Sequence, residues 1–173
     1  MPVSLPDRPD LSEADVLLLR QVAGGHLIDP ISRATGLAAK AVNPAVEALT
    51  ARLGTPYRHR AAALGAAWGW VRPEDVPVSH PTGEALLPRH KQVLAGLVAG
   101  EDPRATAKRL GLAESSVRTY LQTIMRILGV RTRQQATALA VLTDIVPLSA
   151  LGNGWPDTWL SATTSPPAQQ QAS

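Results

Sequence analysis

Apolar residues recur at helical spacing along most of the chain, most clearly between residues 113 and 128. They are separated there by steps of four, three and four residues, which places them on one face of an α-helix: Val117, Leu121, Ile124 and Leu128. The other sides carry hydroxyl, amide and guanidinium groups, and no carboxylate follows Glu114 on them: Ser115, Ser116, Arg118, Thr119, Gln122, Thr123 and Arg126. The pattern predicts a helix over 114–128 with one buried face and one face of donors and cations.

A shorter helical segment precedes this one, and the pair Gly111-Leu112 joins the two. Glycine favours the positive φ that a tight turn between helices requires, so the pattern is typical of a helix-turn-helix. From Pro103 to Arg133 the chain has seven Lys/Arg and one acid, Glu114. A basic cluster on a helix-turn-helix favours contact with phosphates, and a donor-rich helix face suits the major groove of DNA. The alternative is a helical bundle with a solvated basic face.

The stretch from 86 to 146 resembles the LuxR/NarL-type four-helix DNA-binding domain of bacterial transcription regulators. The family's opening, roughly Leu-Thr-x-Arg-Glu-x-Glu-Val-Leu, corresponds to residues 86–94, and its pattern Thr-Val-Lys-x-His to residues 116–120. Three departures are evident. The paired acids of the first helix are missing, Ile127 stands where Lys is usual, and Ala113 replaces a Ser helix cap. The lost cap costs about 1 kcal/mol unless Ser115 or Ser116 replaces it.

The resemblance implies that helix 114–128 enters the major groove. Arg118 is the best candidate for base contact, because Arg can bond two acceptors of guanine at once. Arg104, Ser116, Arg131 and Arg133 are expected to touch phosphates, which position a domain without specifying sequence. The full candidate set for DNA binding is Arg104, Ser115, Ser116, Arg118, Thr119, Gln122, Thr123, Arg126, Arg131 and Arg133.

The two halves of the chain align without a gap at an offset of 75 residues, so the sequence predicts two tandem copies of one domain. Gly36-Leu37-Ala38 pairs with 111–113, and Leu53-Gly54 with 128–129. In the first copy Ser12 is the expected N-cap of the first helix, with Asp15 completing a capping box. The predicted fold is all-α, with two four-helix helix-turn-helix domains at 11–71 and 86–146.

The copies differ on the predicted DNA-contacting face. The polar residues of the second copy are replaced in the first by Ala41, Asn43, Pro44, Glu47, Ala48 and Ala51. Proline inside a helix costs about 3 kcal/mol. We therefore expect Asn43 to cap this helix and Pro44 to open it, about one turn late. The first copy is predicted to be a structural partner rather than a second DNA reader.

The fourth helix is the usual dimer contact in the resembling family. Two arrangements follow: a homodimer through the second copy, or an intrachain pseudo-dimer in which the two fourth helices pair. The candidate interface residues are Ala138, Val141, Leu142 and Ile145 in the second copy, and Ala63, Ala67 and Trp70 in the first. The Pro-rich linker 72–85 spans at most roughly 45 Å when extended, which permits the intrachain pair.

Residues 1–10 are rich in Pro and are predicted to be extended or disordered. Residues 147–173 are rich in Gly, Pro, Ser, Thr and Gln and are predicted to be mostly disordered. Trp155 and Trp159 are the exception, and could dock on the protein's own helices or on a partner. These tryptophans and the neutral first copy favour the alternative function, an interaction module that contacts RNA polymerase, a sigma factor or another regulator. The fold alone does not exclude it.

Composition narrows the classes of site and function that remain. The 173-residue chain has no cysteine, which excludes disulfides and thiolate metal sites. Its net charge of +3 arises entirely after residue 77. The four histidines have no metal-ligand spacing, and no catalytic motif was found, so neither an enzyme nor a cofactor is expected. No signal peptide or membrane-spanning run is evident, which favours a cytoplasmic, nucleoid-associated location.

Overall fold

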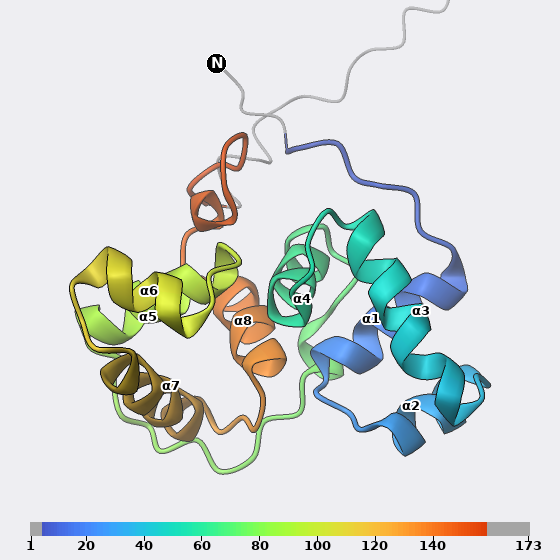
Figure 1. Cartoon of the computed structure of the whole chain (residues 1–173), viewed down its shortest axis with the longest axis horizontal. Helices are drawn as coiled ribbons and strands as arrows, with labels where there is room; N and C mark the ends of the chain where they lie inside the picture. The colour runs from blue at the N-terminus through green and yellow to red at the C-terminus, as the bar shows by residue number, and fades with distance from the viewer. Residues whose placement is uncertain (1–4, 159–173) are drawn as a thin grey trace, which may run out of the picture.

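The computed structural model describes residues 5–158, and no strand occurs in that range (Figure 1). The first four helices are α1 (Glu13–Ala23), α2 (Ile28–Thr35), α3 (Ala39–Arg52) and α4 (Arg58–Ala67). The next four are α5 (Pro88–Val98), α6 (Pro103–Leu110), α7 (Glu114–Leu128) and α8 (Arg133–Leu142). Two 3₁₀ turns, η1 (Pro73–Asp75) and η2 (Leu148–Leu151), complete the order. The prediction of an all-α fold is confirmed.

We call α1–α4 the first unit and α5–α8 the second unit. Each helix of the second unit begins 75 residues after its counterpart in the first, which is the offset that aligns the two halves in sequence. The glycines that end α2 and α6 both adopt left-handed backbone, with φ of 74° at Gly36 and 65° at Gly111. The turn predicted at Gly111 is therefore present. Figure 1 shows the two units on opposite sides of a central pair formed by α4 and α8.

The start of α1 forms as its sequence predicts. The Ser12 hydroxyl accepts a hydrogen bond from the Asp15 N–H at 3.1 Å, and the Asp15 carboxylate accepts one from the Ser12 N–H at 3.2 Å. This capping box satisfies two N–H groups that would otherwise lack partners. Leu18, Leu19 and Val22 are buried on the inner face of the helix.

The late start that Pro44 predicted for α3 is wrong. The helix begins at Ala39, and Pro44 lies inside it. Ala38 is the N-cap, and Asn43 lies inside the helix, where its side-chain oxygen accepts a hydrogen bond from Arg58 Nη2 at 3.0 Å. Val42 and Val46, on either side of the proline, are each only 1% exposed. Burial of this apolar face therefore outweighs the local cost of the proline, which is about 3 kcal/mol.

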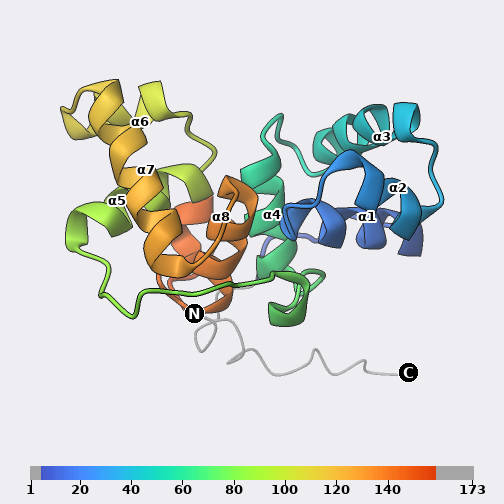
Figure 2. The same cartoon turned by 90° about the horizontal axis from the view of Figure 1, so that it is seen from below.

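The two fourth helices pack side by side at the centre of the molecule (Figure 2). Small residues make this close packing possible: Ala61, Ala62, Ala63, Gly65, Ala66 and Ala67 of α4 and Ala136, Ala138 and Ala140 of α8 are all buried. The Thr137 hydroxyl of α8 donates a hydrogen bond of 2.6 Å to the His59 carbonyl of α4. Of the candidate interface residues, Ala63, Ala67, Trp70, Ala138 and Val141 are buried, and Leu142 and Ile145 are half-buried.

Polar contacts also join the units. The guanidinium of Arg60 donates hydrogen bonds to the carbonyls of Ala99 and Leu151. Gln135 Nε2 of α8 donates to the carbonyl of Pro77 at 3.2 Å. The buried residues of both units belong to one continuous hydrophobic cluster. The units therefore share a core.

The linker lies along the second unit. The Ser79 N–H donates to the Gly129 carbonyl at 2.8 Å, and the Thr82 N–H donates to the Ile127 carbonyl at 3.2 Å. Gly129 has a φ of 71°, and a Cβ at this position would lie 2.8 Å from the backbone of Ser79 and Pro81. Glycine is thus required here both for the end of α7 and for the approach of the linker.

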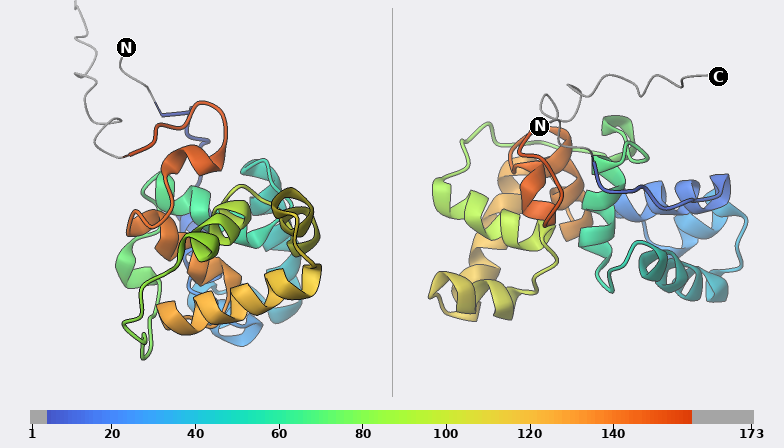
Figure 3. Two further views of the ribbon diagram at one scale, coloured as in Figure 1. Left: turned by 90° about the vertical axis from the view of Figure 1, so that its left-hand side faces the viewer. Right: turned by 90° about the horizontal axis from the view of Figure 1, so that it is seen from above.

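The expected disorder after residue 146 is wrong for residues 147–158. Leu148 and Leu151 of η2 are almost fully buried, and η2 packs against α4 and α5 (Figure 3). Trp155 is 9% exposed, and its ring centroid lies 5.2 Å from that of Trp68. Trp155 therefore docks on the protein's own helices, because Trp68 at the end of α4 is its aromatic partner. Trp159 and the rest of the tail lie outside the described residues.

The N-terminal segment joins the same aromatic cluster. Residues 5–10 form no regular secondary structure, as expected. They are nevertheless fixed in place, because Trp68 Nε1 donates a hydrogen bond of 3.2 Å to the Pro6 carbonyl. The Arg8 guanidinium lies 4.8 Å from the ring centroid of Trp70, a cation–π contact. Among the described helices, none has the length and apolar composition needed to cross a membrane.

Candidate nucleic-acid interface

Helix α7 is 15 residues long and is buried along one face. Val117, Leu121 and Ile124 point into the core, as their spacing predicts. At the end of the helix Ile127 is buried and Leu128 is only half-buried, and both border an open groove beside the linker. The opposite face of α7 is left to solvent.

The first turn of α7 has no side-chain cap. Ala113 occupies the N-cap position, and neither Ser115 nor Ser116 replaces the missing cap. Hydroxyls and backbone N–H groups therefore gather at this end of the helix, where the helix dipole favours anions. A hollow of about 350 Å³ lies beside them, lined by Ser115, Ser116, Thr119 and Tyr120.

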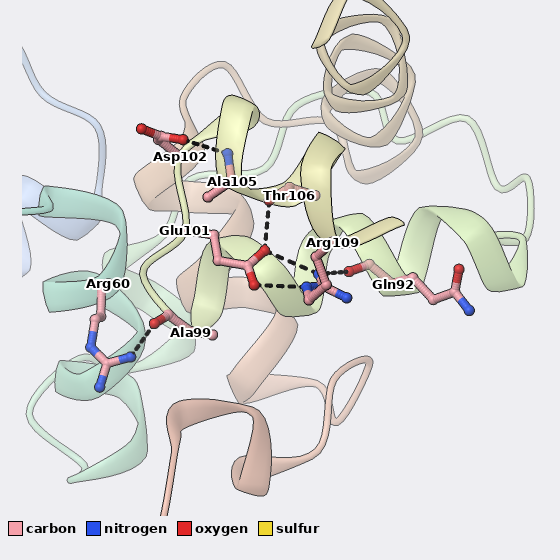
Figure 4. A network of polar contacts seen from close by, with 8 residues as sticks. All are labelled: Arg60, Gln92, Ala99, Glu101, Asp102, Ala105, Thr106 and Arg109. Carbon is pink, nitrogen blue, oxygen red and sulfur yellow. Dashed lines mark hydrogen bonds and ion pairs between the residues drawn. The ribbon is translucent and has the colours of Figure 1, made fainter. Parts of the chain in front are cut away.

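Arg109 is held by a polar network at the junction of α5 and α6 (Figure 4). Its Nε donates to Glu101 Oε1 at 2.7 Å, and its Nη2 donates to Glu101 Oε2 at 3.1 Å and to the Gln92 carbonyl at 3.2 Å. The Thr106 hydroxyl donates to the same carboxylate at 2.8 Å. Arg109 therefore stabilises the fold, and one charge of the basic cluster is neutralised by a carboxylate outside the 103–133 stretch.

Two further arginines of the cluster form exposed ion pairs. Arg118 Nη2 lies 2.6 Å from Glu114 Oε1 one turn away, and Arg126 Nη2 lies 3.2 Å from Glu84 Oε2 of the linker. Sequence analysis missed the second pair because its partners are far apart in the chain. Exposed pairs of this kind contribute only about 0–1 kcal/mol. Either guanidinium can therefore leave its carboxylate for a phosphate or base with only a small loss of free energy.

The structure brings most of the remaining candidates onto the outer surface of the second unit. Arg104, Ser115, Thr119, Gln122 and Arg131 are exposed, and Ser116, Thr123 and Arg133 are half-buried. The Thr119 hydroxyl donates to the Ser115 carbonyl at 3.1 Å, so it is turned onto its own helix. Arg133 lies at the junction with α4, close enough for its charge to act on His59.

The equivalent face of the first unit is chemically different. Helix α3 exposes Lys40, Asn43, Glu47, Ala48 and Ala51. Asn43 is engaged with Arg58, as described above, and Glu47 would repel a phosphate. The corresponding surface of α7 carries two arginines and a glutamine. A donor-rich face at the helix-turn-helix is thus found on the second unit.

The fold and this surface define a helix-turn-helix domain of the kind that binds duplex DNA. Residues 84–140 match the family model described as GerE, bacterial regulatory proteins, luxR family. The match covers α5 to α7 and most of α8, so this part of the chain is a LuxR-type helix-turn-helix domain, a type found in DNA-binding transcription regulators. Helices α1–α4 lie outside the match. No curated protein and no solved structure matches the chain significantly.

The described residues show no sign of a metal centre. Within 5–158 no group of three or more His, Asp or Glu side chains is arranged to hold a metal ion. His59 is buried between the two units, and His90 is buried against Tyr120 at a ring-centroid distance of 5.6 Å. Histidines without metal-ligand spacing are expected to be single and solvated, and the burial of these two corrects that expectation.

Proposed function

We propose that this chain is a sequence-specific DNA-binding transcription regulator and that α7 enters the major groove. The observation that carries the proposal is the outer face of α7 within a LuxR-type domain. Arg118, Gln122 and Arg126 are exposed there, and the side chains of their carboxylate partners Glu114 and Glu84 are 43% and 56% exposed. Donors that can leave weak surface pairs for base edges and phosphates suit this role.

The proposed contacts divide by chemistry. Arg118, near the start of α7, is proposed to bond guanine O6 and N7, with Gln122 and Thr123 beside it in the groove. Arg104, Arg126, Arg131 and Arg133 are proposed to contact phosphates, together with Ser115 and Ser116 at the uncapped end of α7. Arg109 is not in this set, because Glu101 holds it.

We further propose that the chain is a pseudo-dimer with a single DNA-reading unit. Helix α8, the usual dimer contact in the resembling family, is covered by α4. The contacts around this pair are reciprocal: a Cβ at Gly100 would lie 2.7 Å from the Arg60 side chain, and one at Gly25 would lie 3.0 Å from the Gln135 side chain. Arg60 and Gln135 are equivalent at the 75-residue offset, as are Gly25 and Gly100. Such exchange of equivalent contacts is characteristic of an interface with two-fold symmetry.

The test is selection of bound sequences from random duplex DNA at two salt concentrations. Wild type is compared with Arg118→Ala, and with Lys40→Ala as a matched control that removes an exposed cation from α3. We expect one short, non-palindromic motif, because a single reading unit contacts one half-site. A dimer with two reading units would instead require two half-sites about one helical turn apart. Arg118→Ala is expected to weaken binding by about 1–3 kcal/mol and to relax preference at one base pair. Lys40→Ala should leave the motif unchanged.

Other outcomes exclude parts of the proposal. A palindromic motif would show that two second units bind together, which contradicts the pseudo-dimer. Binding without a motif, with a steep dependence on salt, would reduce the interface to a basic surface. Absence of binding would reject DNA recognition altogether.

A further inference from the structure

The first unit has an open cavity at a position where the second unit has an aromatic ring. In the second unit the Tyr120 ring meets the edge of the His90 ring, between α7 and α5. The equivalent residues in the first unit are Ala45 and Asp15. Both line a cavity of about 260 Å³ between α1, α2 and α3. Substitution of the ring by a methyl group thus leaves space in the first unit.

The backbone around this space is preserved even though its filling is lost. His90 Nδ1 accepts a hydrogen bond from the Leu87 N–H at 3.1 Å, just as the Asp15 carboxylate accepts one from the Ser12 N–H. Both side chains therefore cap the first helix of their unit. Because the helices that frame the site begin at equivalent positions, the cavity beside Ala45 is the counterpart of the space that the Tyr120 ring occupies in the second unit.

The lining combines apolar walls with an Asp15–Arg52 ion pair at its edge. Leu18, Leu37 and Leu49 supply apolar walls. Arg52 lies at the edge, where its Nη1 is 2.5 Å from Asp15 Oδ2 and its side chain is more than half exposed. This pair uses one of the five N–H donors of the guanidinium. Within the described residues the other donors of Arg52 have no partner, so a carboxylate can share the guanidinium with Asp15 through a two-point contact.

We propose that the first unit binds a small one-ring aromatic carboxylate in this cavity, with the ring between α1 and α3 and the carboxylate on Arg52. A cavity of this volume is smaller than the sites that hold drug-sized ligands, so a single ring is the appropriate size. The site lies apart from α7 and does not depend on DNA binding by the second unit.

The test is a protein-observed NMR titration of the full chain with 4-hydroxybenzoate. We expect saturable shifts confined to backbone amides of α1, α2 and α3. Ala45→Tyr restores the ring that the second unit carries, and should weaken binding at least about tenfold. Lys40→Tyr adds the same side chain at an exposed position of α3 outside the cavity and should leave binding unchanged. Ala48→Leu, which narrows the same cavity, replaces Ala45→Tyr if that variant does not fold.

Three comparison probes identify the ligand class. Tyramine has the same ring with a cationic substituent, and cyclohexanecarboxylate has the carboxylate without an aromatic ring; both should bind more weakly than 4-hydroxybenzoate. Equal binding of either probe would overturn the assigned chemistry. A blocked Gly-Tyr-Gly peptide that binds more tightly than 4-hydroxybenzoate would show that the natural occupant is a protein side chain. Absence of shifts at millimolar probe, or shifts that persist in the cavity-filling variants, would reject the site.

Discussion

The two units of this protein share a framework and differ at their surfaces. Val42 and Val117 are both buried at equivalent positions of α3 and α7, and Gly54 and Gly129 end these helices with φ of 77° and 71°. The outer faces diverge, with Asn43 in the first unit where the second has Arg118. Core positions and turn glycines are therefore sufficient to preserve the four-helix arrangement. In the proposed function, DNA recognition depends on side chains that this arrangement leaves free to change.

The largest expected effect comes from separating the units. Ala138 on α8 is fully buried in the shared core, and Ala138→Arg would place an unpaired charge there. We expect a loss of at least about 4 kcal/mol in the free energy of unfolding, measured by urea denaturation. Ala51→Arg, on the exposed face of α3, is the control and should change stability by no more than about 0.5 kcal/mol. Equal stability of the two variants would mean that α4 and α8 do not pack together in solution.

Replacement of Pro44 should have a smaller effect on the free energy of unfolding and should raise it. Because the proline lies inside α3 and lacks an N–H, Pro44→Ala should stabilise the chain by about 1–3 kcal/mol. Pro88 occupies the first position of α5, where proline is favourable, so Pro88→Ala is the matched control and should give no stabilisation. Thermal unfolding of both variants gives the comparison. An unchanged melting temperature for Pro44→Ala would show that α3 begins after the proline, as the sequence alone suggested.

The arginines of the second unit should separate into structural and DNA-binding groups. Arg109→Ala leaves Glu101 without its guanidinium partner and should lower stability by about 1–2 kcal/mol. Arg126→Ala breaks only an exposed pair, so stability should change little, while the slope of log binding constant against log salt falls by about one. Unfolding and DNA titration are measured on each variant. A loss of stability in Arg126→Ala comparable to that in Arg109→Ala would contradict this division.

Local signals in the sequence predicted much of the fold. The capping box at Ser12, the turn at Gly111 and the buried face of α7 each depend on residues within one or two turns, so the pattern contains the whole cause. The family resemblance over residues 86–146 depends on local patterns in the same way, and the family model matches residues 84–140. The expected start of α3 failed because packing of Val42 and Val46 outweighs the helix propensity of Pro44.

Two features that the sequence pattern did not predict join distant residues. Glu84 meets Arg126 only because the linker lies against α7, and Trp155 meets Trp68 only because η2 folds back on α4. The cavity beside Ala45 has a partial signal, since the 75-residue alignment pairs this alanine with Tyr120. The alignment shows that a ring is missing, but whether neighbouring side chains fill its place depends on the packing of three helices.

The smallest predicted effect concerns the titratable side chain of His59. The equivalent residue of the second unit, Gln134, has no titratable group. Burial lowers the pKa of the His59 imidazole below its ordinary value of 6.5, and the nearby charges of Arg133 and Arg60 act in the same direction. The Glu101 backbone and the Asp102 carboxylate oppose the shift. Within the described residues its Nε2 has no hydrogen-bond partner, and the ring stacks on Tyr57 at a centroid distance of 5.3 Å. The neutral form is therefore the one that fits between the units.

The sign of the resulting pH dependence follows from linkage. Because the unfolded chain protonates His59 at a higher pH than the folded chain does, stability is fully present above pH 6.5 and falls as the pH is lowered below 6.5. His59→Gln should reduce this slope in urea unfolding measured across that range, whereas His26→Gln, at an exposed position, should leave it intact. If both variants keep the wild-type slope, protonation of His59 does not destabilise the α4–α8 contact. The junction would then tolerate a charged imidazole despite its burial and the two neighbouring arginines.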